Sequence, residues 1–185
     1  MPRAAETDLS PAEWASLALL AEQPAHGFAV ARALAPEGEV GRVWSCSRPL
    51  VYRALERLGD LSLVEERGTE PSEAGPRRTV LGATRAGRRE LERWFGEPAA
   101  HVRELRSSLM LKLLFLSRRG ADASPLLEGQ RSVLTALVAG LEEAAGVAGG
   151  FDRVLYLWRL ESARAALRFV DDLLSSAEPA ASPSP

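Results

Sequence analysis

Hydrophobic residues in the first part of the chain recur at helical spacing and predict three successive helices. The first begins at Ser10-Pro11, because a serine cap, a proline in the first turn and Glu13 three residues after the cap form a capping box. A short second helix is expected over residues 26–35, and a third over residues 47–58. The expected buried stripe of the third helix consists of Val51, Ala54, Leu55 and Leu58.

The opposite face of this third helix is polar. At 100° per residue, that face carries Pro49, Tyr52, Arg53, Glu56 and Arg57. Ser47 is expected to cap the helix, and Arg48 follows it. The helix therefore has one face that can anchor it in a core and another that offers an aromatic hydroxyl and arginines to a partner.

Turn residues and short β-prone segments predict a β-hairpin after these helices. The expected strands are Leu63–Arg67 and Arg77–Leu81, and residues 68–76 between them are rich in turn formers. Thr84 then fits the cap of a fourth helix that ends near Gly96.

The second half of the chain is expected to be all helical. Helices are predicted over residues 102–116, 125–145 and 151–176. The first of these is apolar nearly all round, so it must be covered on several sides. The last carries an apolar stripe of Val154, Leu155, Trp158, Ser162, Ala165, Phe169 and Leu173. Three helices would struggle to hide this surface, which predicts a homodimer held through residues such as Leu109 and Phe169.

The predicted organisation is a mainly α fold in two domains. Residues 9–96 have the helix, helix, helix, hairpin, helix order of a winged helix-turn-helix with a two-stranded wing. Residues 101–176 are expected to form an all-helical dimerisation domain. Residues 177–185, rich in proline, serine and alanine, are expected to form a disordered tail.

Composition narrows the class of protein. The chain has 185 residues, 46% hydrophobic and 26% charged, as in ordinary globular proteins. It has no apolar block long enough to span a bilayer and no N-terminal signal core, so a cytoplasmic protein without membrane contact is expected. One cysteine and two histidines leave little for a disulfide framework or metal site, and no metal or cofactor is expected. No nucleophile has an evident base and orienting group, so we do not expect an enzyme.

The charge distribution indicates a localised basic segment. The net charge is −2, yet residues 42–93 hold eleven arginines against eight acidic residues, which is +3 in this segment and −5 elsewhere. Such a segment fits a face that binds phosphates, although a solvated surface gives the same pattern.

A winged helix-turn-helix inserts its third helix into the major groove of DNA and lays its hairpin along the backbone or minor groove. Double-stranded DNA is therefore an expected partner. The candidate DNA-binding residues are Ser47, Arg48, Tyr52, Arg53, Arg57, Arg77 and Arg78. Arginine can contact guanine edges and phosphates in bidentate fashion, and the first turn of the helix offers free N–H groups to a phosphate.

The same stretches resemble the PadR family of bacterial transcriptional regulators. The matching segments are Leu19–Phe28, Leu50–Leu58, Gly75–Thr79, Thr84–Gly87 and Trp94-Phe95. The resemblance implies that Tyr52 and the basic wing contact DNA, and that the helical second half is a dimerisation domain like that of virulence-activator relatives. Two departures concern the wing: the family usually has glycine at Ser62 and an aromatic residue at Leu81-Gly82.

The resemblance also implies a ligand-responsive repressor that acts as a homodimer on a palindromic operator. Trp14, Trp94 and Trp158 are expected by residue type to be core or interface aromatics. The resemblance implies the alternative that they line a pocket for a small aromatic or hydrophobic effector. The alternative function is a helical protein-interaction or small-molecule-sensing module that does not bind DNA. Salt-dependent binding to duplex DNA separates the two functions.

Cys46 lies at the predicted start of the third helix, near Arg42 and Arg48. The helix dipole and these arginines would lower the pKa of its thiol and allow a redox switch. A buried, inert thiol is the simpler interpretation.

Overall fold

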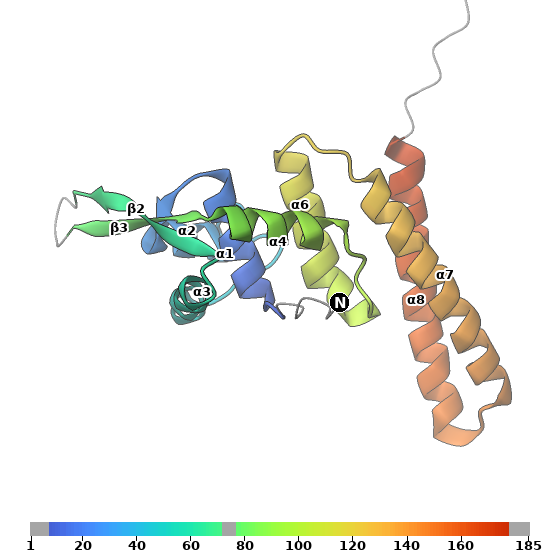
Figure 1. Ribbon diagram of the computed structural model, residues 1–185. Coiled ribbons are helices and arrows are strands. Elements are labelled where there is room, and N and C mark those ends of the chain that lie inside the picture. The colour runs from blue at the N-terminus through green and yellow to red at the C-terminus, as the bar shows by residue number, and fades with distance from the viewer. Residues whose placement is uncertain (1–7, 72–76, 178–185) are drawn as a thin grey trace, which may run out of the picture. The chain divides into compact units, whose positions relative to one another are not determined.

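The computed structural model describes residues 8–71 and 77–177 (Figure 1). The chain divides into two compact units, which are described separately below. The first contains the residues up to Phe95 together with Met110–Phe115, and the second contains Gly96–Leu109 and the chain from Leu116 onward. Of the tail predicted at residues 177–185, all but Ala177 lies outside the described residues.

The first unit contains the predicted order of three helices, a hairpin and a fourth helix. Its elements are α1 (Pro11–Glu22), β1 (Ala25–His26), α2 (Gly27–Ala33), α3 (Arg48–Asp60), β2 (Val64–Glu70), β3 (Arg78–Ala83) and α4 (Arg85–Gly96). The strand β1 was not predicted, because two residues carry no periodic signal. It pairs antiparallel with β3, so the sheet has the order β1-β3-β2.

The helix α1 lies at the centre of the first unit. The predicted capping box is present, since the Glu13 amide donates to Ser10 Oγ at 3.4 Å and the Ser10 amide donates to Glu13 Oε2 at 2.6 Å. Most residues of α1 are buried, and the helix packs against α3. Trp14 of α1 stacks on Trp94 of α4 with ring centroids 4.9 Å apart. This core fixes where α3 and α4 can lie.

The helix α3 buries the stripe that its sequence predicts. Val51, Ala54, Leu55 and Leu58 are buried, so the polar face of the helix points to solvent. The chain then turns into β2 through Ser62, which has a φ of 54°. Glycine favours this left-handed conformation, and Ser62 adopts it with a side chain present. The backbone turn into the wing is therefore made without the expected glycine.

The start of α4 is tied to the turn that precedes β2. Thr84 Oγ1 donates to the Ser62 carbonyl at 2.9 Å and accepts from the Gly87 amide at 3.0 Å, which confirms Thr84 as the cap of α4. A Cβ on Gly87 would stand 2.1 Å from the Leu63 carbonyl oxygen. Only glycine permits this approach, which holds α4 against the base of the wing.

The second half of the chain is helical, as predicted. Its helices are α5 (Val102–Glu104), the π-helix η1 (Leu105–Leu109), α6 (Met110–Arg118), α7 (Ser124–Val147) and α8 (Gly150–Ala177). The helix predicted over residues 102–116 is present, but its segment η1 is π-helical. The π-helical turn adds a residue to the turn and thereby changes which positions share a face.

The second unit is built around the α7–α8 hairpin (Figure 1). Arg164 of α8 bridges to Glu142 of α7 at 2.7 Å and to Glu161 at 2.8 Å. The fully buried side chain of Gln130 donates to the Ala99 carbonyl at 3.0 Å and accepts from the Ala99 amide at 2.7 Å. These two bonds satisfy a buried backbone segment and attach it to α7.

The fold thus has the predicted class: mainly α, with an antiparallel hairpin and helices in the C-terminal half. None of the helices in the described ranges has a stretch long and apolar enough to cross a membrane.

Candidate nucleic-acid interface

The exposed face of α3 carries the residues that the sequence predicted for it. Tyr52 is 42% exposed, and Arg48, Arg53 and Glu56 are also exposed. Ser47 occupies the N-cap position and is exposed, but its hydroxyl makes no capping hydrogen bond. Ser47 is thus the N-cap residue, as predicted, and the helix begins at the next residue without a bond from the serine hydroxyl.

The ring of Tyr52 rests on the start of α2. A Cβ on Gly27 would stand 3.0 Å from Tyr52 Cε1 and 3.2 Å from Leu55 Cδ1. The missing side chain of Gly27 therefore makes room for the tyrosine ring. His26 caps the same helix, because its Nδ1 accepts from the Ala29 amide at 3.1 Å. Tyr52 is held by packing while part of its ring stays in solvent.

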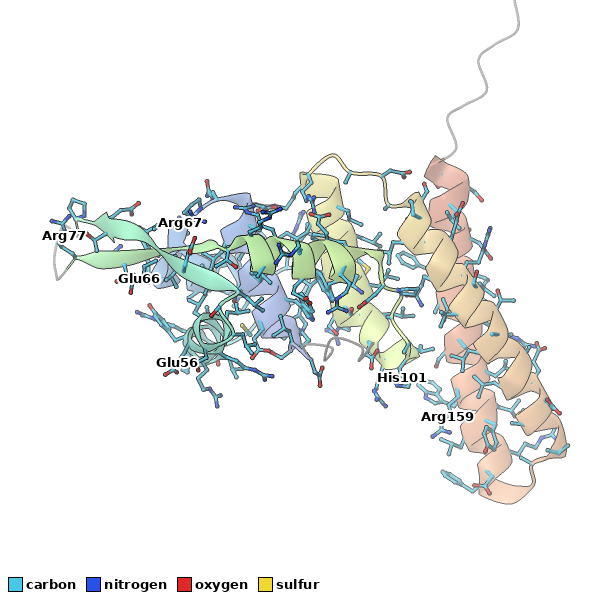
Figure 2. All side chains as sticks on the ribbon, in the orientation of Figure 1. Glu56, Glu66, Arg67, Arg77, His101 and Arg159 are labelled. Atoms are coloured by element: carbon cyan, nitrogen blue, oxygen red, sulfur yellow. The ribbon has the colours of Figure 1, made fainter. Side chains whose placement is uncertain are left out.

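A groove of about 600 Å³ lies between α3, the start of α2 and the β2–β3 wing. Arg48, Tyr52 and Glu56 line it from α3, and Glu66 and Arg78 line it from the wing. Figure 2 shows Glu56 and Glu66 on the two elements that flank it. The groove therefore brings together exposed residues that the sequence places far apart.

Phe28 of α2 also lines this groove, and sequence reasoning did not select it. The ring is 43% exposed. The guanidinium carbon of Arg48 lies 5.3 Å from its centroid, and that of Arg78 lies 5.6 Å from it. Arg48 is also 5.6 Å from the Tyr52 centroid. Distances within about 6 Å are those of cation–π interactions.

The wing arginines differ in what they contact. Arg77 is exposed, and its Nε donates to Thr69 Oγ1 on β2 at 3.0 Å (Figure 2). Arg67, which the sequence did not single out, pairs with Glu65 at 2.8 Å and donates to the Ala83 carbonyl at 3.2 Å. Arg67 therefore stabilises the base of the wing, whereas Arg77 and Arg78 stand at the end nearer its turn.

Arg57 and Arg53 lie on the same face of α3 but have different surroundings. Arg57 forms an ion pair with the buried carboxylate of Glu13 at 3.4 Å and donates to the Asp8 carbonyl at 3.1 Å. It therefore attaches α3 to the beginning of α1. Within the described ranges, Arg53 has neither an ion pair nor a hydrogen bond of its side chain. Its guanidinium is the freer of the two to meet an incoming ligand.

The three tryptophans of the effector prediction do not share one environment. Trp14 and Trp94 are buried in the core of the first unit, where the Lys112 ammonium lies 5.0 Å from the Trp94 centroid. Trp158 belongs to the second unit and is 72% exposed. It borders a cavity of about 560 Å³ that is also lined by His101, Val102, Arg103, Leu137, Leu141, Arg159 and Ser162. Figure 2 shows His101 and Arg159 from this cavity.

Cys46 is half-buried just before α3. Burial raises the pKa of its thiol above the ordinary value, since removing the site from water disfavours the thiolate. The direction of this shift favours the buried, inert thiol over the redox switch. Across the described residues, no three histidine, cysteine, aspartate or glutamate side chains gather as a metal ion would need.

A compact set of helices whose third member exposes a polar, arginine-bearing face beside a β-hairpin defines a winged helix-turn-helix protein. Residues 17–93 match the model of the Transcriptional regulator PadR-like family. This match supports the resemblance to the PadR family that the sequence predicted over this segment.

Solved structures and curated proteins give weaker comparisons. Bacillus subtilis PadR in complex with operator DNA is 21% identical, covering 89% of this chain and 97% of that one, with a TM-score of 0.45. The same protein in complex with p-coumaric acid is 18% identical over 97% and 100%, with a TM-score of 0.41. The Vibrio cholerae virulence activator AphA is 25% identical over 90% and 97%, with a TM-score of 0.39. No curated protein matches the chain. The resemblance to the PadR-like family therefore rests on the match over residues 17–93.

The raised pKa of Cys46 predicts slow alkylation near neutral pH. The thiolate is the reactive form, so its fraction at pH 7 falls when the pKa rises. We expect the rate of iodoacetamide modification, measured against pH, to have a higher midpoint in the folded protein than in the same protein unfolded in urea. A lower midpoint in the folded protein would show that the fold lowers the pKa of the Cys46 thiol and would support the redox switch.

Proposed function

We propose that this PadR-like regulator binds duplex DNA as a homodimer and represses transcription from a palindromic operator. In this proposal α3 enters the major groove and the wing arginines meet the flanking backbone. The observation that carries it is the exposed surface formed by Tyr52, Arg53, Arg48 and Arg78. Within the described residues, these three arginines form no ion pair, so their N–H groups are available to phosphates or guanine edges.

Dimerisation is supported by a helix face that has no partner within its own unit. The inner face of α8 buries Leu160, Ala163 and Val170. On another face, Phe151, Val154, Trp158 and Phe169 fall within an arc of about 60° at 100° per residue and are all exposed. An apolar stripe of this kind is typical of a surface that a second copy covers. A two-fold dimer would present two α3 helices to two half-sites of an operator.

The cavity beside Trp158 supports a response to a small effector. It combines the apolar surface of Trp158 and Leu141 with the basic side chains of Arg103 and Arg159. Because Trp158 belongs also to the exposed stripe of α8, an occupant would alter the surface proposed to hold the dimer. An effector could thereby favour one of two dimer geometries and release DNA.

Arg53 is predicted to read the operator. In fluorescence anisotropy with a duplex taken from directly upstream of the gene, the dissociation constant should rise steeply with salt. Arg53→Ala should cost about 1–3 kcal/mol and loosen sequence preference. Arg57→Ala is the matched control and should lose less, because Arg57 is already paired with Glu13. Absence of duplex binding at every salt concentration would instead support an interaction or sensing module without DNA binding.

Phe169 is predicted to hold the dimer. Phe169→Glu places a charge in the exposed stripe and should shift the mass measured by light scattering from dimer to monomer. Arg168→Glu, one residue earlier and also exposed, is the control and should stay dimeric. Leu109, the other predicted interface residue, is buried, so charging it would test folding. A dimeric Phe169→Glu protein would contradict the proposed interface.

The cavity beside Trp158 is predicted to bind small aromatic anions. In calorimetric titrations, p-coumaric acid should bind and its uncharged methyl ester should bind more weakly, because Arg103 and Arg159 favour a carboxylate. Arg159→Ala should reduce the affinity for the acid. Equal binding of acid and ester, or an unchanged affinity in the variant, would exclude this cavity as the site.

A further inference from the structure

We propose that Phe28 is a positioning residue for DNA binding, whose ring holds the guanidinium groups of Arg48 and Arg78 in place for phosphates or base edges. The inference deepens the proposed function and rests on it. It concerns a residue of α2, an element that carries none of the DNA-binding residues predicted from the sequence.

The geometry joins three elements through one ring. Arg48 opens α3, Arg78 opens β3, and both guanidinium carbons lie within 5.6 Å of the Phe28 centroid. Arg48 is within the same distance of the Tyr52 centroid, so it contacts two aromatic rings at once. Phe28 thereby links the first turn of α3 to the wing, two parts of the surface that are expected to contact the same DNA.

A cation–π contact can position a guanidinium and still leave its N–H donors available. The ring attracts the cation without using its N–H groups as an ion pair does, and the five N–H groups stay available for hydrogen bonds. Among the described residues, Arg48 and Arg78 have neither an ion pair nor a hydrogen bond of their side chains. Their position is therefore restricted while their donors are kept for a ligand.

The groove also contains acidic residues, which could pair with Arg48 and Arg78 if these side chains were free to rotate. Asp60 and Glu56 lie toward the end of α3, and Glu65 and Glu66 lie on β2. A freely rotating arginine near these carboxylates would be drawn into ion pairs that compete with phosphate. Contact with Phe28 keeps Arg48 and Arg78 at the end of the groove where α3 begins. The basic and acidic ends then favour one placement of the DNA backbone over the other.

The decisive experiment compares side chains of similar size with and without an aromatic face. Phe28→Leu keeps an apolar side chain and removes the ring, whereas Phe28→Tyr keeps the ring. Duplex affinity should fall by about 5- to 30-fold in Phe28→Leu, because two arginine side chains that the ring no longer restrains must then be ordered on binding. Phe28→Tyr should bind as the unaltered protein does, and circular dichroism should show that both variants are folded at the temperature of the binding measurement. Leu61→Ala removes an exposed apolar residue outside the cluster and is the control.

A double-mutant cycle identifies the mechanism. In the Phe28→Leu background, Arg78→Ala should weaken DNA binding by a smaller factor than it does in the unaltered protein. Additive losses would overturn the proposal, as would unchanged affinity in Phe28→Leu or failure of Phe28→Tyr to restore it.

A measurement without DNA separates this inference from the proposed function. In NMR spectra of the free protein, the side-chain Hδ protons of Arg48 and Arg78 should be shifted upfield by the Phe28 ring and lose that shift in Phe28→Leu. If the shifts are present and no duplex binds, the proposed function fails although the contacts exist. If the shifts are absent, the positioning role of Phe28 is overturned whether or not DNA binds.

Discussion

The burial of one stripe of α3 is the constraint on which the rest of the surface depends. Val51 and Leu58 are fully buried, and α1 and α2 pack against the helix. Since a helix turns by 100° per residue, this anchoring leaves Tyr52 and Arg53 no direction except outward. Packing of the Tyr52 ring against Gly27 then fixes the ring beside the groove. A polar face with a defined orientation is what groove reading requires.

Electrostatic selectivity arises locally in a protein whose net charge is −2. The arginines near the groove divide into those that stabilise the fold, such as Arg57 and Arg67, and those that keep their donors free, such as Arg53 and Arg78. Counting arginines in a sequence does not reveal this division. It depends on which carboxylates and carbonyls the fold brings near each guanidinium.

The helices of the first unit could be predicted because caps and apolar periodicity are local signals, as at Ser10 and Thr84. Three features depended on tertiary contacts and could not. The strand β1 exists only through its pairing with β3. The sequence left both an activated and a buried, inert thiol open at Cys46, and only the fold shows the burial that raises its pKa. In the sequence, Phe28 cannot be distinguished from the other apolar residues of its helix. Only the fold brings Arg48 and Arg78, from distant segments, onto its ring.

The central claim is that the exposed face of α3, with the adjacent wing, is the surface that meets DNA. Backbone and arginine side-chain NMR shifts, followed while a duplex from upstream of the gene is added, test it most directly. The account predicts that the changes concentrate on residues 47–57 and on the residues around Arg77 and Arg78. Changes confined to α7 and α8, with α3 unaffected, would contradict it.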